Sequence, residues 1–339
     1  MSKKMLSINP ITFPWKTEDP FLFCAYHHDL YPPGNGHFGP KKEALSGRYI
    51  GQDFSGKDGW SMYHGQDIPG FPYHPHRGFE TVTINKKGVV DHSDSLGAAG
   101  RFMAGDVQWM TAGKGVQHSE MFPLIHEDQP NHLEIFQIWL NLPAKNKFVE
   151  PHFKMLWKEA IPVIDTIHND CITQIDLVAG SYRDYQAPET TPDSWAANPE
   201  NGVRILTVKI DVGGMFDVDA VSKEVNRNIY FYKGDQLTID GKEVNAGHII
   251  KLKPDEAIAL ENTGSKTAFI LLLEGKPINE PVAQHGPFVM NTMDEIQETM
   301  MEFQRTQFGG WPWKEREKSH GADLKRFAIH ADGREEIKE

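Results

Sequence analysis

Cysteine is scarce in this sequence. Its 339 residues include only Cys24 and Cys171, and no C-x-x-C pair occurs. Two cysteines are too few for a disulfide framework, and the lack of a C-x-x-C pair excludes the common thiolate zinc and redox motifs. This cysteine content is typical of a protein of the reducing cytoplasm, and we expect that location.

Long apolar runs are also missing. The longest is AFILLL, from Ala268 to Leu273, which is far shorter than the roughly 20 residues that span a bilayer. The N-terminal segment MSKKMLSINPITFPW has two lysines but no apolar stretch of the kind found in signal peptides. We therefore expect neither secretion nor membrane insertion.

Positive charge is in deficit, because 35 Lys and Arg residues face 47 Asp and Glu residues and the formal net charge is −12. Nucleic-acid binding depends largely on Lys and Arg that displace counterions from phosphates. The sequence therefore predicts no direct contact with nucleic acid. An acidic surface is more compatible with a protein partner than with DNA.

Glycine and proline are plentiful, with 30 and 22 residues respectively. They interrupt short stretches of β-branched and aromatic residues about every ten positions, which is typical of all-β sandwiches and barrels. The clearest predicted strands are FETVTIN, DVQWMTA, HLEIFQIWLNL, GVRILTVKIDV, RNIYFYKG, DQLTIDGKEV, HIIKLK and TAFILLLEG. Asp240 and Gly241 are predicted to form a hairpin turn between two of these short runs.

The chain length favours two domains. The polar, proline-containing segment 142–147 is predicted to link an N-terminal domain, residues 1–141, to a C-terminal domain, residues 148–290. The segment QAPETTPDSWAANPENG carries three prolines and is predicted to be a long surface loop of the second domain.

One convincing helix follows the last strand, in a final segment that covers residues 291–339. In TMDEIQETMMEFQ, Thr292 and Glu295 have capping-box spacing, and Ile296, Met300 and Phe303 lie on one helical face. That apolar stripe is interpreted as core packing. The stretch from Trp311 to Glu339 mixes both charges, and it is predicted to be a solvated, partly disordered tail.

The segment YHPHRGFETV places His74 and His76 on one face of a predicted strand, because side chains alternate across a strand. Glu80 would share this face. By itself, an H-x-H pair is more often two hydrogen-bonded or surface histidines than a metal site. The pair therefore becomes meaningful only with further ligands.

Such ligands occur in TAGKGVQHSEMFP, where His118 and Glu120 repeat the same spacing about forty residues later. A β-meander could place them beside His74 and His76, so that three imidazoles and one carboxylate converge. Nitrogen and oxygen donors without thiolate, with one or two open positions, favour non-heme Fe(II) over structural zinc. Mn, Ni, Co and catalytic Zn are compatible with the same donors.

Glu80 is the competing carboxylate. It lies four residues beyond His76, which is about 13 Å along an ideal strand, so it is assigned a supporting or structural role. Six other histidines lack partners at ligand spacing and are interpreted as surface or hydrogen-bonded core residues, although one could orient a ligand imidazole. They are His64, His92, His126, His132, His152 and His168.

Several segments resemble the signature segments of the pirins, a family of the cupin superfamily. They are GFPYHPHRGFETVT, GDVQWMTAGKGVQHSEM, FQIWLNLP, VEP and QHGPFVMNT. The sequence departs from the general cupin pattern at Thr111, which stands where a proline is usual, while Gly105 and Gly113 keep the frame of the second motif. These departures are themselves similar to those of pirins.

The resemblance implies a bicupin fold of two β-barrels with a C-terminal helix. It implies iron in the N-terminal barrel, held by the positions that match the family's ligands, His74, His76, His118 and Glu120. It also implies a second barrel without metal, and residues 203–290 supply only His248 and His285 for one. We expect a monomer with one metal site.

The same resemblance implies a quercetin 2,3-dioxygenase-like oxidoreductase that opens a flavonol ring with dioxygen. In this hypothesis Glu120 is both a ligand and the catalytic base, and Phe71 and Tyr73 form aromatic walls of the substrate pocket; simple loop packing is the alternative for the two rings. The alternative function is an iron-dependent redox sensor that binds a transcription factor or a metabolic enzyme without turnover. A cupin isomerase, or another dioxygenase, is the third hypothesis.

Overall fold

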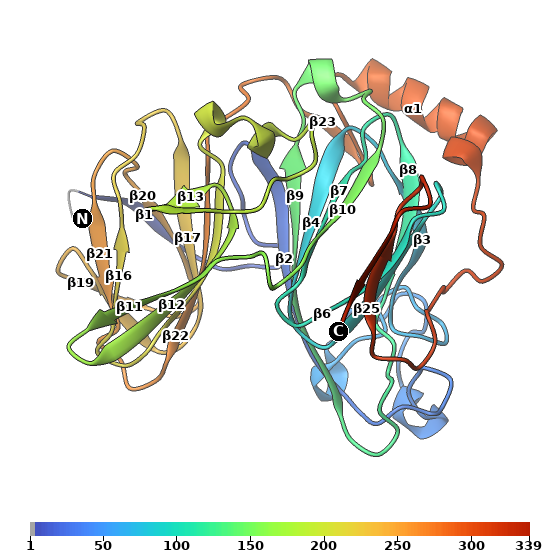
Figure 1. Cartoon of the computed structure of the whole chain (residues 1–339), viewed down its shortest axis with the longest axis horizontal. Helices are drawn as coiled ribbons and strands as arrows, with labels where there is room; N and C mark the ends of the chain where they lie inside the picture. Colours follow the sequence, from blue (N-terminus) through green and yellow to red (C-terminus); the bar gives the residue numbers. More distant parts are fainter. Residues whose placement is uncertain (1–3) are drawn as a thin grey trace. The chain divides into compact units, whose positions relative to one another are not determined.

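The computed structural model describes residues 4–339, which are folded mainly as antiparallel β-strands (Figure 1). The predicted all-β bicupin fold is confirmed, since each of two compact units contains two sheets. Unit 1 comprises Met1–Cys24 and Lys158–Asn279, and unit 2 comprises Ala25–Trp157 and Glu280–Glu339. The prediction that the N-terminus has no signal-like segment includes residues 1–3, which lie outside the described residues.

Unit 1 consists mainly of a seven-stranded and a four-stranded sheet. The larger sheet has the order β1 (Met5–Pro10), β20 (His248–Leu252), β17 (Asn226–Lys233), β22 (Ala268–Gly275), β15 (Arg204–Ile210), β12 (Cys171–Ala179) and β11 (Val163–His168). The smaller sheet has the order β16 (Met215–Val218), β21 (Ile258–Glu261), β18 (Gln236–Ile239) and β19 (Lys242–Asn245).

Unit 2 has a five-stranded and a six-stranded sheet. The first has the order β10 (His152–Leu156), β7 (Val107–Thr111), β4 (Phe79–Lys87), β9 (Asn131–Asn141) and β2 (Phe21–Tyr31). The second has the order β26 (Glu335–Lys338), β25 (Arg326–Ile329), β6 (Ala99–Met103), β5 (Val89–Asp94), β8 (Val116–Met121) and β3 (Gly70–His76). All eight segments predicted as strands in the sequence contain strands of these four sheets.

The remaining elements are short, apart from one helix. Two hairpins pair β13 (Ser181–Tyr182) with β14 (Tyr185–Gln186) and β23 (Ala283–His285) with β24 (Phe288–Met290). The α-helix is α1 (Met293–Thr306), and the 3-10 turns are η1 (Lys42–Leu45), η2 (Lys57–Gly59), η3 (Ala144–Asn146), η4 (Trp195–Ala197), η5 (Pro199–Asn201) and η6 (Gln307–Gly309).

The units divide the chain differently from the predicted domains. Strand β1 pairs with β20, so the N-terminal segment belongs to the same unit as the C-terminal domain. The predicted linker 142–147 lies inside unit 2, where the buried Lys147 ammonium donates to the Gly78 carbonyl and to Asn141 Oδ1, both at 2.8 Å. A polar segment that contains proline indicates a linker only if its polar groups face solvent. The Lys147 ammonium instead donates to buried oxygen atoms.

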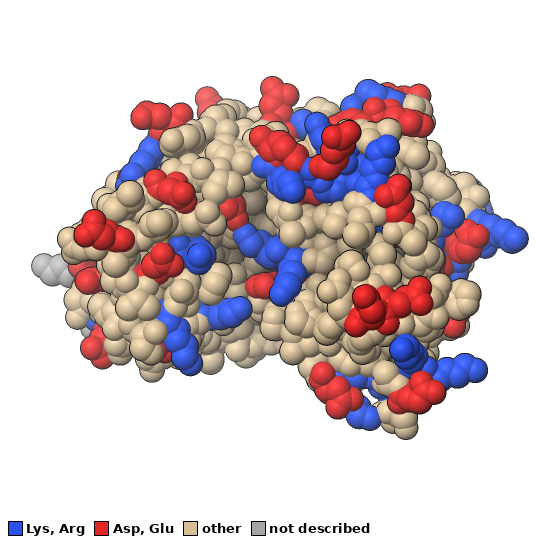
Figure 2. All heavy atoms as spheres, turned by 60° about the horizontal axis from the view of Figure 1, so that its bottom comes forward, with Lys and Arg blue, Asp and Glu red and all other residues tan. Residues whose placement is uncertain are grey.

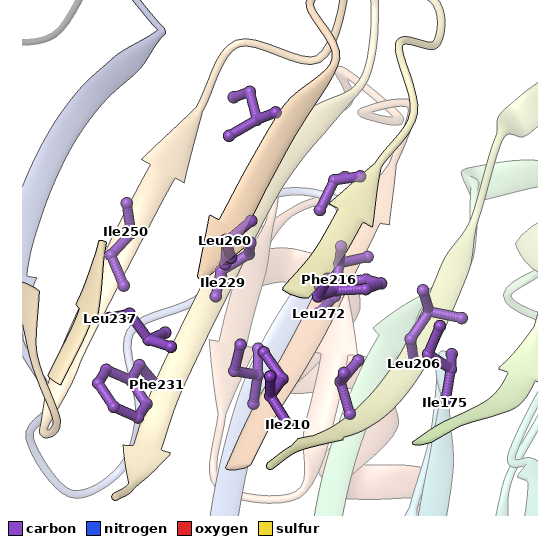
Figure 3. Packing of buried hydrophobic residues seen from close by; sticks show 14 of the residues in the cluster. Ile175, Leu206, Ile210, Phe216, Ile229, Phe231, Leu237, Ile250, Leu260 and Leu272 are labelled. Carbon is purple, nitrogen blue, oxygen red and sulfur yellow. The ribbon is translucent and has the colours of Figure 1, made fainter. Parts of the chain in front are cut away.

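The core of unit 1 follows from the alternation of its strands. Ile175, Leu206 and Leu272 from the larger sheet and Phe216 and Leu260 from the smaller one are fully buried in one cluster. Figure 3 shows these side chains pointing into the space between the strands. Period-two apolar positions therefore bury one face of each sheet.

The predicted turn and helix are both confirmed. Asp240 and Gly241 join β18 to β19 with φ angles of 49° and 72°, the left-handed values that a tight type I′ hairpin requires. In α1, the Thr292 hydroxyl accepts from the Glu295 N–H, and the Glu295 carboxylate accepts from the Thr292 N–H. The predicted apolar face packs against unit 2 through Ile296.

The C-terminal segment is ordered, so the prediction of a solvated, partly disordered tail is wrong. Strand β25 pairs with β6, and β26 pairs with β25, which extends a sheet of unit 2 (dark red in Figure 1). The reason is charge pairing: the Arg101 guanidinium binds the Asp91 carboxylate and also donates to the carbonyls of Gly321 and Asp323. Arg326 likewise binds Asp106. These buried ion pairs and hydrogen bonds stabilise the C-terminal segment, although its charged composition alone indicates exposure to solvent.

No helix among residues 4–339 is long and apolar enough to cross a membrane. Basic and acidic side chains are both distributed over the face shown in Figure 2, and acidic groups border the basic ones.

Candidate metal centre

Three imidazoles converge inside unit 2. His74 and His76 end β3, and His118 lies directly opposite His74 on the antiparallel neighbour β8. One potential ligand nitrogen from each of the three histidines lies within 4.8 Å of the others, the only group of at least three such side chains found among residues 4–339. Direct pairing of β3 with β8, rather than a meander of consecutive strands, therefore brings these three residues together.

The hydrogen bonds of His74 and His76 direct their Nε2 atoms inward. The Nδ1 atom of His74 lies 2.9 Å from the Pro72 carbonyl, and that of His76 lies 3.4 Å from the Pro287 carbonyl. A carbonyl only accepts, so each Nδ1 carries the proton and each neutral ring has its lone pair on Nε2. The two Nε2 atoms are 3.0 Å apart, where their lone pairs repel unless a cation lies between them.

A proton is an unfavourable cation here. Burial lowers the pKa of His74 to about 4 and that of His76 well below its usual range. At neutral pH both rings are therefore neutral.

The surroundings of His118 give the strongest support for a metal site. The ring is fully buried, and among the described residues neither of its nitrogens has a hydrogen-bond partner. Its centroid lies 4.6 Å from that of His74 and 4.9 Å from that of His76. A buried polar group without a partner costs about 1 to 3 kcal/mol, and a divalent metal would offset that cost. The three residues thus fit a metal ion.

Glu120, the predicted fourth ligand, is buried on β8 but lies outside the three-histidine group. Its two carboxylate oxygens accept hydrogen bonds from Thr83 Oγ1 and Gln137 Nε2, each at 2.7 Å. Burial raises the pKa of the carboxyl, and the Thr83 hydrogen bond opposes this shift. That Glu120 is a metal ligand stays a prediction. The structure shows that its carboxylate is buried and accepts two hydrogen bonds.

Sequence reasoning missed the polar chain that holds Glu120. Gln137 Oε1 lies 2.9 Å from His27 Nε2, and His27 Nδ1 lies 2.8 Å from the Tyr63 hydroxyl, which donates to Asp29. The one available signal was a glutamine within the otherwise apolar run IFQIWL, residues 135–140. A single sequence does not indicate which distant residues such a glutamine contacts.

Glu80 does not share a face with the histidines as predicted. Gly78, with φ +84°, separates β3 from β4 and breaks the alternation. Phe79 therefore contacts His76, with ring centroids 4.9 Å apart, while the buried Glu80 accepts hydrogen bonds from Trp109 Nε1 and Thr111 Oγ1. These contacts support a structural role for Glu80.

The predicted pocket aromatics are engaged in packing. Phe71 stacks on Tyr63, with centroids 5.1 Å apart, and its edge faces His74 at 6.4 Å. Tyr73 stacks on Trp311 of the C-terminal segment at 5.0 Å. Both rings thus have structural partners, and their role as substrate walls stays a prediction.

His92 is the buried histidine nearest the centre that was not predicted as a ligand. Its ring lies 5.6 Å from that of His118 and stacks on Phe153. Gln108 Nε2 donates to its Nδ1 at 2.8 Å, and Asp94 lies 3.5 Å from its Nε2. These contacts are those of a hydrogen-bonded core histidine. The other five assigned in the same way, His64, His126, His132, His152 and His168, are also absent from the three-histidine group.

Acid is expected to destabilise the metal-free protein. Burial lowers the pKa of His27 to about 4, against an ordinary value near 6.5. Between these pH values the unfolded chain binds more protons, so the stability present above pH 6.5 is lost as the pH falls toward 4, by roughly 3 kcal/mol for such a histidine. Urea unfolding of chelator-treated protein at pH 7 and pH 4.5 measures the difference.

The matched comparison for this pH dependence is His27→Gln, which removes the titrating ring. Its free energy of unfolding should fall less between pH 7 and pH 4.5 than that of the original chain. An equal loss in both proteins would show that His27 does not titrate as its burial predicts.

Comparisons with known proteins find family-model matches in both halves of the chain. Residues 39–140 match the family model described as Pirin, and residues 205–309 match the Pirin C-terminal cupin domain. A Pseudomonas aeruginosa protein named "Putative quercetin 2,3-dioxygenase PA3240" is 33% identical over 239 residues, 70% of this chain and 79% of that protein. Human pirin is 34% identical over 244 residues, 71% of this chain and 78% of its own length.

A solved structure is similar over nearly the whole length. The crystal structure of quercetin 2,3-dioxygenase from Acinetobacter baumannii aligns with a TM-score of 0.71 and 26% identity, and covers 91% of this chain and 99% of its own. The C-terminal strands β25 and β26 lie beyond both family-model matches.

Proposed function

This chain belongs to the pirin family, and from that premise we propose that it is a metal-dependent dioxygenase of the quercetin 2,3-dioxygenase type. The proposed substrate is a flavonol-like aromatic with an acidic ring hydroxyl, and the proposed metal is Fe(II). The substrate class comes from the names of the relatives and of the structural neighbour. The metal comes from a donor set of neutral imidazoles without thiolate.

The observation that carries this proposal is the fully buried His118, whose nitrogens lack a partner among the described residues, beside the facing Nε2 atoms of His74 and His76. A site built only for stability would satisfy these nitrogens with protein donors or acceptors. Here the ligand nitrogens of three neutral imidazoles remain available to a cation. His74, His76 and His118 would hold the metal.

When bound, such a metal supplies Lewis acidity toward a substrate hydroxyl and a place for dioxygen chemistry. The protein's own task would be to remove the hydroxyl proton, and Glu120, buried on the strand that carries His118, is the proposed base. Burial raises the pKa of its carboxyl, which makes the carboxylate a stronger base than an exposed one. Thr83 and Gln137 hold its two oxygens in a fixed orientation.

The apolar surroundings of the centre limit its contact with water. Phe79 and Trp139 pack against the His76 ring at 4.9 and 5.5 Å. In a site of low polarity the charge of the Glu120 carboxylate interacts more strongly with a nearby cation or acidic proton. Proton transfer to Glu120 is thereby favoured.

Glu120→Gln tests the role of the base separately from metal binding. The amide keeps the shape of the side chain but does not accept a proton, so turnover of quercetin should fall about 10²-fold or more. If the three histidines suffice to hold the metal, its content should stay near one per chain by elemental analysis. Unchanged turnover would rule out Glu120 as the base, and loss of the metal would instead identify it as a ligand.

The activity itself is tested with protein loaded anaerobically with Fe(II), to which quercetin and oxygen are added. Loss of the flavonol absorbance should accompany equimolar oxygen uptake, and metal-free protein should show neither. Absence of turnover with Fe(II), Mn, Ni, Co and Zn alike would overturn the enzymatic proposal. In that case a partner captured from extract by only the ferrous or only the ferric form would support the regulatory alternative.

A further inference from the structure

Unit 1 contains a cavity of about 620 Å³, well away in sequence from the three histidines. The proline-rich segment predicted as a surface loop forms much of its wall, because η4 and η5 fold back over the start of β15. Cavities of roughly 300 to 1,000 Å³ hold most small-molecule ligands. The volume is thus sufficient for an organic molecule of moderate size.

The cavity is lined at its base by a buried charge cluster. The Glu274 carboxylate accepts from Arg204 Nε and Nη2 at 3.1 and 3.0 Å, and from Arg227 Nε at 2.6 Å. Arg227 also donates to the carbonyls of Asp219, Lys253 and Glu256, and it does not line the cavity. Arg204 and Glu274 do line it.

Arg204 is the incompletely paired member of this cluster. Its side chain is 7% exposed, and among residues 4–339 its Nη1 group has no hydrogen-bond acceptor. Two guanidinium groups also share the Glu274 carboxylate, so Arg204 has only part of one carboxylate as its partner. A buried charge is costly unless it is paired, so the cluster favours a second anion.

We propose that this cavity is a binding site for a small organic carboxylate with an apolar body. The carboxylate would accept from Arg204 Nη1, which Glu274 leaves available. A carboxylate matches the one available edge of the Arg204 guanidinium, whereas a phosphate dianion would need further donors. This site is separate from the proposed dioxygenase function and does not depend on it.

The rest of the lining fits the apolar body. Ala187, Val203 and Val225 are buried, and Pro188 and Pro192 line the same cavity. The charged groups at the margin do not compete with Arg204: Lys276 is paired with Glu224 at 2.7 Å, and the acids Glu189 and Glu200 are exposed. Solvent screens exposed charges strongly. The available Nη1 edge of Arg204 therefore decides which ligands are preferred.

Binding is tested by calorimetry with the full chain, using benzoate, its neutral analogue benzamide, and inorganic phosphate as probes. We expect benzoate to bind at least tenfold more tightly than benzamide or phosphate. Arg204→Gln should weaken benzoate binding at least tenfold. The matched control is Arg183→Gln, because Arg183 is an exposed arginine outside the cavity and its loss should leave binding unchanged.

A second variant keeps the proposal testable if Arg204→Gln fails to fold. Ala196→Phe places a ring in the cavity from the half-buried η4 without altering the charge cluster, and it should abolish benzoate binding. Three results would overturn the proposal: no benzoate binding at millimolar concentration, equal binding of benzamide, or unchanged binding by the folded Arg204→Gln or Ala196→Phe variant.

Discussion

His118→Ala is expected to eliminate metal binding and to reduce quercetin turnover to the uncatalysed background. The three-histidine group would be left with two imidazoles, both from β3. A metal that binds only the folded chain stabilises it by about 4 kcal/mol at a thousandfold excess over its dissociation constant. That stabilisation should be present in the original chain and absent in the variant.

The same substitution separates a metal ligand from a structural core residue. The His118 side chain makes no hydrogen bond within the described chain, so the metal-free variant loses packing but no polar partner, and it removes a buried unsatisfied group. Thermal unfolding with and without Fe(II) measures both effects. The metal should raise the midpoint only when His118 is present.

His37→Ala is the matched control, because His37 is an exposed histidine of the same unit. Its metal content, thermal shift and turnover should equal those of the original chain. One bound metal per chain in the His118→Ala variant, with undiminished turnover, would exclude the proposed centre.

The sequence predicted the three histidines because the information was local. Two side chains at positions i and i+2 share a strand face whatever the rest of the fold, so YHPH indicated two converging imidazoles and HSE indicated where a third could come from. Only the pairing of the two strands had to be supplied, and His74 does lie opposite His118. The strand face of Glu80 was predicted wrongly because Gly78, which has a positive φ angle, ends the strand. The sequence alone does not reveal the φ angle of a glycine.

Non-local contacts account for what the sequence did not predict. The pairing of β1 with β20 depends on residues more than 200 positions apart, and no local composition encodes it. Likewise, Gln137 and Thr83 reach Glu120 from other strands. The segment from Trp311 contains many charged side chains. Such a composition predicts exposure to solvent only when these side chains have no buried partners. Arg101 and Asp106 are such partners.

Arg101→Ala is expected to destabilise unit 2 by about 3 to 5 kcal/mol, because it leaves the Asp91 carboxylate buried without its guanidinium. Both side chains are fully buried, and Arg101 Nε and Nη2 each donate to Asp91 at 2.7 Å. Arg101 also holds the carbonyls of Gly321 and Asp323. Its loss should therefore release the C-terminal segment, which limited proteolysis would detect as faster cleavage after residue 310.

The double variant Asp91→Ala/Arg101→Ala decides whether the buried charge causes this loss. Removing both partners eliminates the unpaired carboxylate, so the double variant should be at least about 1 kcal/mol more stable than the sum of the two single changes predicts. Lys114→Ala breaks an ion pair between exposed residues and should change the free energy of unfolding by less than about 0.5 kcal/mol. Strict additivity in the double variant would show that Arg101 acts through packing alone, and rapid cleavage without destabilisation would show that it only tethers the C-terminal strands.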